Sequence, residues 1–294
     1  MKYTNLTNLP EVFETFGRTN KYSKAGADYS VTGLLAPPRM NILENSHKSD
    51  LRAEVSEDVF ALFGSAVHHV LEQGASFDHT SEERLFAQIG GKNVSGQIDL
   101  QEDHEGGVSI TDFKVTSVWS VMLGEKQEWV DQLNSYAFLV EHEYRKPITR
   151  LQIVGIMRDW KKRESRTKRD YPKSPIISIP IPIKPYEDRL ALLEERVAFH
   201  EKAKRDWEDA GTLPMCTPDE TWERPGKWAV HNKDAIRAKK LFDNVIKAEA
   251  LANTVKGYKV VRRPGEVPRC ADWCRVADWC DQYDAWKKVN GEPK

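Results

Sequence analysis

Residues 96–114 read GQIDLQEDHEGGVSITDFK, and this stretch decides the fold predicted for the 294-residue chain. Apolar residues alternate or run together on both sides of a polar turn with two glycines, a pattern that predicts a β-hairpin. In such a hairpin Asp99 and Asp112 approach each other from adjacent strands. Lys114 lies two residues after Asp112 and therefore projects from the same face. The stretch thus predicts two acids and a lysine at one place.

Converging carboxylates of this kind form a hard-oxygen site suited to Mg²⁺ or Mn²⁺. Such a metal activates water, and a neighbouring lysine orients that water or neutralises developing negative charge. The combination indicates hydrolysis of a phosphodiester. The alternative is an ordinary ion pair at the surface. A second tripeptide with an acid, any residue and a lysine is Asp159-Trp160-Lys161. No Gly-x-Ile-Asp strand precedes it, so we interpret it as solvated surface without a catalytic role.

Apolar periodicity predicts the elements around the hairpin. Helical spacing predicts a core-packed helix over about 56–74, a second helix over 129–144 and a long charged helix from about residue 186. Residues 151–157 predict a strand, and the proline-containing alternation of 175–183 suits only a sheet edge. The predicted fold class is α/β, with a central mixed sheet flanked by helices and a C-terminal cysteine-cluster subdomain.

Length, composition and charge predict the domains of the chain, its class of protein and its cellular location. We expect an N-terminal segment over residues 1–50, a core domain over 51–210 and a cysteine-bearing region over 211–294 that packs on the core. Length and 39% hydrophobic residues exclude a disulfide miniprotein and a wholly disordered chain. The net charge of −1 means that polyanions could bind only through local clusters. Without a long apolar run or an apolar leader, we expect a cytoplasmic protein with no membrane partner.

Four short motifs follow one another in a fixed order along the chain. They are Gly64-Ser65-Ala66-Val67-His68 with Glu72, Gly96-Gln97-Ile98-Asp99, Asp112-Phe113-Lys114 and Gln132-Leu133-Asn134-Ser135-Tyr136. This set resembles the RecB-type nucleases of the PD-(D/E)XK superfamily over about residues 28–140, and the ordered set is far more specific than any single member. The resemblance implies a restriction-endonuclease-like core over 51–210. The proline that precedes the first acid in the family is absent here.

The resemblance also implies a site of six residues, which are His68, Asp99, Asp112, Lys114, Gln132 and Tyr136. In the family the histidine and both acids ligate the metal, here Mg²⁺ or Mn²⁺, and the lysine serves catalysis. The helix with the glutamine and tyrosine supports the site and the DNA. His68 follows the apolar Val67, so it can reach inward, where a neutral imidazole ligates metal. His69 is the competing candidate, and Glu72 is a weaker candidate for orienting a ligand.

All four cysteines lie in the last third of the chain, at Cys216, Cys270, Cys274 and Cys280. Four thiolates suit a [4Fe-4S] cluster or a tetrahedral zinc ion, whereas disulfides are disfavoured in a reducing cytosol. Unrelated buried thiols are the alternative. The intervals of three and five residues beside Trp273 and Trp279 fit a cluster better than zinc. In this respect the chain resembles phage-encoded and CRISPR-associated iron-sulfur exonucleases of the same class, although they usually draw the first cysteine from before the core.

Two basic clusters accompany these motifs. Residues 158–173 hold eight Lys and Arg against three acids. The second cluster lies near Trp222 and Trp228 and comprises Lys227, Lys233, Arg237, Lys239 and Lys240. Local basic density with aromatic residues suits phosphate tracking and base stacking on a single strand, although a basic run is also typical of solvated surface.

The function predicted from these features is metal-dependent hydrolysis of DNA. The resemblance implies an exonuclease that acts on single strands or duplex ends in recombination, repair or phage DNA processing, with a helicase or recombination protein as a possible partner. A non-catalytic DNA-binding or scaffolding subunit is the alternative from another class, and the complete set of two acids and a lysine argues against it. An endonuclease of the same superfamily is the alternative among enzymes.

Overall fold

The computed structural model describes residues 2–19, 23–74, 76–124, 126–232 and 235–291. The chain forms two compact units. Unit 1 comprises Met1–Pro38 and Arg52–Thr212, and unit 2 comprises Arg39–Leu51 and Leu213–Lys294. The segment Arg39–Leu51 therefore belongs to unit 2, although it lies within the stretch 1–50 that the sequence treats as one N-terminal segment.

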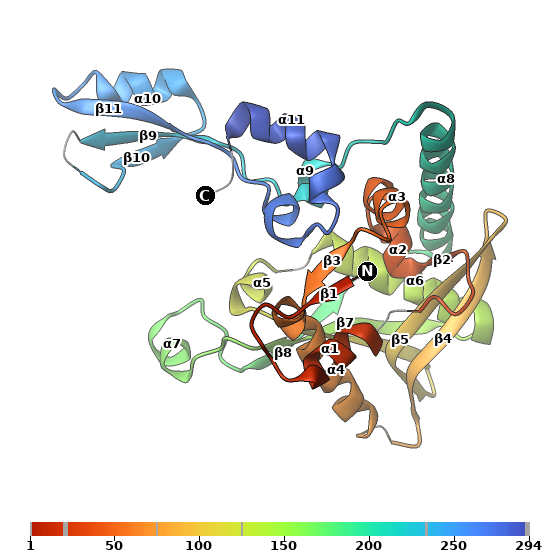
Figure 1. The fold of residues 1–294 in the computed structure, drawn as a ribbon. Coiled ribbons are helices and arrows are strands. Elements are labelled where there is room, and N and C mark those ends of the chain that lie inside the picture. The colour runs from red at the N-terminus through yellow and green to blue at the C-terminus, as the bar shows by residue number, and fades with distance from the viewer. Residues whose placement is uncertain (1, 20–22, 75, 125, 233–234, 292–294) are drawn as a thin grey trace. The chain divides into compact units, whose positions relative to one another are not determined.

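A six-stranded mixed sheet forms the centre of unit 1 (Figure 1). Its strands are β2 (Tyr29–Ser30), β4 (His79–Ile89), β5 (Lys92–His104), β6 (Gly107–Thr116), β7 (Ile148–Met157) and β8 (Ile176–Ile181). The order is β2-β5-β6-β7-β8, and β4 pairs with β5. The β5–β6 pair is antiparallel and forms the predicted hairpin, whereas β6 and β7 are parallel. Strand β8 lies at the edge, as its prolines predict.

Helices flank this sheet. They are α1 (Glu11–Thr19), α2 (Val31–Leu35), the 3-10 turn η1 (Val55–Asp58), α4 (Val59–Glu72), α5 (Val118–Met122), α6 (Gln127–Tyr144), α7 (Lys162–Thr167) and α8 (Tyr186–Ala210). A short parallel pair, β1 (Lys2–Thr4) with β3 (Arg52–Glu54), completes the unit. Ten of the eighteen residues of α6 are buried, and its Leu133 joins Ile98 and Ile110 of the sheet in the main core. The predicted α/β class with a central mixed sheet is confirmed.

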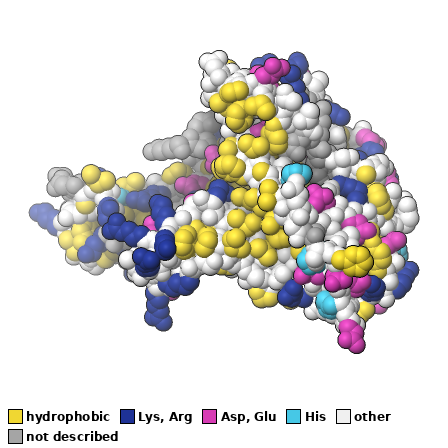
Figure 2. All heavy atoms as spheres, turned by 90° about the horizontal axis from the view of Figure 1, so that it is seen from below, with side chains coloured by type: hydrophobic (Ala, Val, Ile, Leu, Met, Phe, Trp, Pro, Cys, Tyr) yellow, Lys and Arg dark blue, Asp and Glu magenta, His cyan; other side chains and the backbone are white. Residues whose placement is uncertain are grey.

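Helix α4 corrects one expectation, because its apolar residues do not form a buried face. Phe60, Phe63 and Val70 are 42%, 44% and 65% exposed. The helix meets β6 through the side that carries His68, and the Arg158 guanidinium lies 4.5 Å from the Phe60 ring centroid. Figure 2 shows hydrophobic side chains gathered on the face seen from below, the side on which α4 lies in Figure 1. Apolar spacing predicted the helix correctly but not which side of it would be covered.

Unit 2 combines a small sheet with the cysteine-bearing segment. Its elements are α3 (Pro38–Ser46), α9 (Pro218–Thr221), β9 (Lys227–Asn232), β10 (Lys240–Phe242), α10 (Val245–Ala252), β11 (Tyr258–Arg263), the short turns η2 (Arg269–Trp273) and η3 (Ala277–Trp279), and α11 (Asp281–Asn290). The three strands form an antiparallel sheet of order β10-β9-β11. Within the described residues, every helix of either unit is too short or too polar to cross a membrane.

Candidate active site

The candidate site lies where the pairing between β5 and β6 ends. The last paired residues are Leu100 and Thr111, so Asp99 and Asp112 would be the next facing pair. Here the strands no longer pair through their backbones, and the N–H of Phe113 donates instead to Asp99 Oδ2 at 2.8 Å. The two acids therefore come from adjacent strands at the point that the hairpin pattern indicated.

Asp112 is 1% exposed, and its two carboxylate oxygens have different neighbours. Lys114 Nζ lies 2.7 Å from Oδ2, and Gln132 Nε2 of α6 donates to Oδ1 at 3.1 Å. The same amide nitrogen donates to Tyr136 Oη at 3.0 Å. Four of the six residues indicated by the motifs thus form one connected polar group between β6 and α6.

Lys114 is held as a cation. Burial opposes its charge, but the charge of Asp112 and the hydrogen bond to it outweigh burial, so the pKa of Lys114 is raised. An ammonium that keeps its proton at neutral pH cannot accept one from water. Its chemistry at this position is therefore electrostatic: it can offset negative charge and donate hydrogen bonds.

His68 reaches the same place from α4. Its Nδ1 lies 3.1 Å from Glu82 Oε1 and 3.6 Å from Asp99 Oδ1, and its Nε2 lies 3.2 Å from the carbonyl oxygen of Phe113. The hydrogen bond with Glu82, only partly opposed by burial, raises the pKa of His68 to about 9. The competing His69 has a side chain that is 70% exposed and lies 3.9 Å from Glu72, outside this group.

Glu82 belongs to the group and is the residue that the sequence analysis missed. It lies on β4, a strand that was not predicted, and has a φ of +53°, a region that residues other than glycine rarely adopt. Its Oε2 accepts a hydrogen bond from Gln97 Nε2 at 2.7 Å. The largely apolar run at the end of residues 79–89, Leu85-Phe86-Ala87-Gln88-Ile89, was a signal that could have indicated the strand.

The group fits a divalent cation. One ligand atom from each of His68, Glu82 and Asp99 lies within 4.8 Å of the other two. Burial and the charge of Asp112 raise the pKa of Asp99 to about 7, because adjacent carboxylates resist ionising together. A bound divalent cation would remove that penalty, and carboxylate oxygens with a neutral imidazole are suitable ligands for it. The donor set therefore makes this a candidate metal site.

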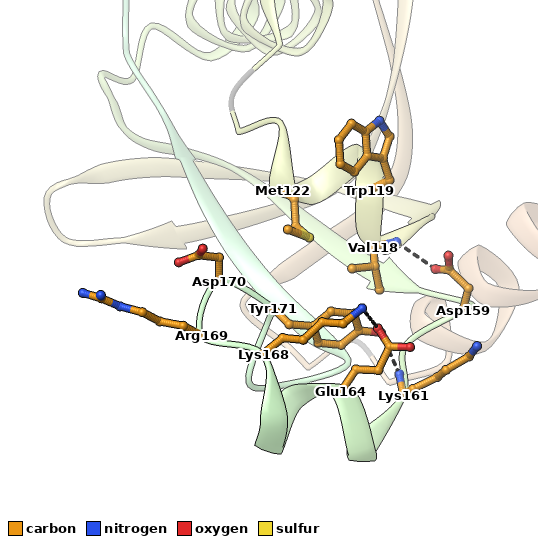
Figure 3. A pocket seen from close by; sticks show the side chains of 10 residues that line it. All are labelled: Val118, Trp119, Met122, Asp159, Lys161, Glu164, Lys168, Arg169, Asp170 and Tyr171. Carbon is orange, nitrogen blue, oxygen red and sulfur yellow. Dashed lines mark hydrogen bonds and ion pairs between the residues drawn. The ribbon is translucent and has the colours of Figure 1, made fainter. Parts of the chain in front are cut away.

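A pocket of about 680 Å³ opens at the carboxyl ends of β6 and β7 (Figure 3). Helix α5, which begins four residues after Lys114, contributes the exposed Trp119 and Met122 to its wall. The Val118 N–H donates to Asp159 Oδ1 at 2.7 Å and holds the start of α5 against the segment after β7. Basic and acidic side chains of that segment complete the lining; they are Lys161, Glu164, Lys168, Arg169 and Asp170.

The four cysteines all lie in unit 2 as free thiols. Burial is the main cause that raises the pKa of Cys216 to about 12 and that of Cys270 to about 11, and the charges of the other cysteines add to both shifts. Cys280 is buried, and Arg39 Nη1 lies 3.8 Å from its sulfur. Thiols in such surroundings ionise when a metal compensates their charge, so the donor set fits a thiolate-bound metal centre.

Comparisons with known proteins identify a family for this chain. The sequence model of the PD-(D/E)XK nuclease superfamily matches residues 57–281. Among solved structures, the crystal structure of SSO0001 is 19% identical with a TM-score of 0.41, covering 63% of this chain and 81% of that one. The structure of a "Putative exonuclease" from Eubacterium rectale is 10% identical with a TM-score of 0.31, covering 70% of this chain and 83% of that one. No curated protein matches the chain.

The structural likenesses are loose at these TM-scores, so the family assignment rests on the sequence match. That match spans well over half of the chain and includes all four motifs. The mixed sheet flanked by helices agrees with the restriction-endonuclease-like fold of that family. The chain therefore belongs to the PD-(D/E)XK nuclease superfamily.

Proposed function

We propose that this chain is a DNA exonuclease that depends on Mg²⁺ or Mn²⁺. The observation that carries the proposal is the convergence of Asp99, Asp112 and Lys114 with His68 at the end of the β5–β6 pairing. An ordinary surface ion pair would not bury Asp112 to 1% exposure beside a second acid whose pKa is raised to about 7. Membership of a nuclease superfamily supports the same reading.

His68, Asp99 and Asp112 are the residues proposed to hold the metal, with Glu82 beside them. When bound, the metal supplies Lewis-acid activation of water and of the scissile phosphate. The Phe113 carbonyl lies within hydrogen-bond distance of His68 Nε2, so the neutral imidazole can keep its proton there and leave Nδ1 toward the acids. The Phe113 N–H holds Asp99 by its Oδ2. One residue between the two catalytic motif positions thus orients two ligands.

Lys114 is proposed to act on the phosphate during hydrolysis, and Gln132 holds the carboxylate that pairs with Lys114. Hydrolysis joins a water oxygen to phosphorus and breaks a P–O ester bond, and negative charge grows on the phosphoryl oxygens meanwhile. The Lys114 ammonium is proposed to offset that charge, because the carboxylate of Asp112 keeps it protonated. Gln132 fixes the carboxylate of Asp112 from α6, and Tyr136 accepts from the same amide.

The pocket at the ends of β6 and β7, whose lining begins four residues after Lys114, is proposed to bind nucleotides of the substrate. Trp119 is 63% exposed at its wall, and an exposed indole offers a stacking surface for a base. Lys161 and Arg169 of the lining come from the basic stretch 158–173 and could meet phosphates. Nothing in this lining favours a particular base, so we propose cleavage without sequence specificity.

At Cys216, Cys270, Cys274 and Cys280 we propose a [4Fe-4S] cluster with a structural role in unit 2. Burial raises the pKa of Cys216 and of Cys270, so a bound metal would have to stabilise their thiolates; the charges of Arg39 and Arg269 oppose part of that rise. The Val276 N–H also hydrogen-bonds Cys274 and favours its thiolate. The alternative occupant of these four cysteines is a zinc ion, which measurement of the bound metal would distinguish from iron. Recombination, repair or phage DNA processing in the cytoplasm, alongside a helicase or recombination protein, is the setting proposed for the activity.

The test is digestion of linear and covalently closed circular DNA, single- and double-stranded, with Mg²⁺ or Mn²⁺. Lys114→Ala is compared with Lys146→Ala, whose lysine also pairs with an aspartate of the hairpin, Asp103, at the far end of β5. We expect loss of linear DNA only, abolished by Lys114→Ala and kept by Lys146→Ala. Cutting of circles would instead indicate an endonuclease. No cutting by the intact protein would indicate a DNA-binding subunit.

A further inference from the structure

Positive charge in this chain is concentrated in one part of unit 2. Residues 227–263, which form β9, β10, α10 and β11, contain ten Lys and Arg but only three Asp and Glu. This gives the stretch a net charge of +7, whereas the whole chain has a net charge of −1. A solvated surface in an otherwise acidic chain does not need such a concentration, because mixed charges keep proteins soluble.

The pairing of the strands brings several of these cations onto one face. In the antiparallel register Arg263 lies opposite Lys227, and Lys259 lies opposite His231. Side chains alternate along a strand, so Lys259, Val261 and Arg263 project from the same side of β11. From Lys259 to Arg263 the strand rises by four residue steps, or about 13 Å. This length matches about four nucleotides of a duplex strand at about 3.4 Å per nucleotide.

The outer strands of this face are open to solvent. Val261 and Leu241, which lie on this face on either side of Ala229, are 40% and 45% exposed, whereas Ala229 and His231 of the central strand are buried. On the opposite face Tyr258, Val260 and Phe242 are half-buried, and α10 packs against all three strands. We therefore assign α10 to the opposite face, and on the cationic face Lys259, Val261 and Arg263 of β11 are exposed.

The cations on this part of the chain are almost all free of acidic partners. Among its described residues, Lys227 alone has a carboxylate within ion-pair distance, that of Asp243. Lys259 and Arg263 are exposed and have no such neighbour. Unpaired, solvated cations release counterions from a polyanion on binding, whereas paired cations must first break their ion pairs.

We propose that this face, defined as Lys227, Leu241, Lys259, Val261 and Arg263, is a second DNA-binding surface, in unit 2, that holds the sugar-phosphate backbone. The proposal rests on the proposed function, because it takes DNA to be the substrate. Charge complementarity identifies the partner, and the exposed valine and leucine suit contact with sugars. The cations of this face match phosphates and not the hydrogen-bonding pattern of a particular base, so the face would bind DNA without recognising its sequence.

The test compares Lys259→Glu with Arg263→Glu, made together, with Lys204→Glu and Arg205→Glu on the exposed side of α8. Both double variants change the net charge equally. Binding of the full chain to a labelled single strand and a labelled duplex is measured in EDTA over a range of salt concentrations. We expect the sheet variant to bind at least about tenfold more weakly, with the slope of log K against log salt reduced by about 2. The α8 variant should resemble the wild type.

Equal binding and equal salt slopes for the sheet variant and the wild type would overturn the proposal. Equal losses in both double variants would also overturn it, because total charge would then explain the effect. Lys259→Gln with Arg263→Gln tests the same surface with a smaller change of charge, and melting temperatures confirm that each variant is folded. With metal present, the sheet variant should keep its kcat and raise its KM on long DNA. If the wild type cleaves no DNA, the proposed function is wrong. The binding comparison in EDTA still tests the proposed surface, because it does not depend on cleavage.

Discussion

The backbone N–H of Phe113 donates a 2.8 Å hydrogen bond to Asp99 Oδ2, and the carbonyl oxygen of the same residue lies 3.2 Å from His68 Nε2. A single peptide position between Asp112 and Lys114 therefore contacts the two other motif residues through its main chain. Because these contacts use backbone atoms, the side chain at this position is not what aligns the site. The geometry depends on β6 leaving its pairing with β5 at this residue.

Asp99→Asn separates the charge of this acid from its hydrogen bond. The amide oxygen can still accept from the Phe113 N–H, so the fold should be retained, but the negative charge is lost. We expect at least tenfold weaker Mn²⁺ binding by calorimetry and a matching loss of DNA cleavage at low metal. Asp103→Asn, at the other end of β5, is the control and should behave like the wild type. Unchanged metal affinity in Asp99→Asn would remove this acid from the site.

Glu82→Gln tests the residue that only the structure brought to the site. Glutamine keeps the length of the side chain but cannot supply a charged ligand, and it supports the His68 imidazole less strongly. We expect Mn²⁺ affinity to fall by about 10- to 100-fold, with cleavage recovering as the metal concentration is raised. Glu83→Gln is the matched control, since its carboxylate instead accepts from Gln101. The same metal titration for Glu82→Gln and the wild type would show that this glutamate has no part in metal binding.

The contrast between Asp99 and Glu82 explains how much the sequence could reveal. Asp99 and Asp112 lie in one hairpin, so local alternation and a short turn were enough to predict that they meet. Glu82 lies on a strand whose residues before Leu85 show no regular alternation, and with its left-handed φ it is left out of the β4–β5 register between Ser81 and Glu83. Likewise the spacing of α4 predicted a helix, whereas the exposure of Phe63 depends on what the rest of the chain leaves uncovered.

Trp119→Ala tests the pocket at the ends of β6 and β7. Stacking of a base on an aromatic ring contributes about 1–3 kcal/mol, so its loss should raise the KM for DNA by roughly 5- to 150-fold. Trp119→Phe keeps a ring and should recover most of the affinity. Leu123→Ala removes a neighbouring side chain that is 62% exposed but does not line the pocket, and it serves as the control. Equal effects of Trp119→Ala and Leu123→Ala on KM would exclude stacking at this position.

Cys280→Ser tests the metal centre proposed for unit 2. The wild type, purified without oxygen, should contain about four iron atoms per chain and absorb visible light, whereas the variant should lose both. Its melting temperature should also fall, because ligation energy contributes to folding. One zinc per chain and no visible absorbance would favour the tetrahedral alternative. If the wild type contains neither iron nor zinc and is only as stable as the variant, the four cysteines are unrelated free thiols.

His200 should make unit 1 less stable in mild acid. Its imidazole is 3% exposed, and its Nε2 lies 3.0 and 3.2 Å from the carbonyl oxygens of Leu34 and Ala36, to which Arg196 also donates. Burial, with the charge of Arg196, lowers the pKa of His200 below its usual value near 6.5. The unfolded chain therefore takes up a proton that the folded chain resists, and the free energy of unfolding falls as the pH drops below about 6.5.

The measurement for His200 is the melting temperature at pH 7.5 and pH 5.5. Glutamine can donate to a carbonyl oxygen without titrating, so His200→Gln should reduce the loss of stability between the two pH values, even if its melting temperature at pH 7.5 is lower. His69→Gln changes a histidine whose side chain is 70% exposed, and it should leave the pH dependence as in the wild type. If all three proteins lose the same stability in acid, other groups cause the loss, and His200 does not couple protonation to the fold.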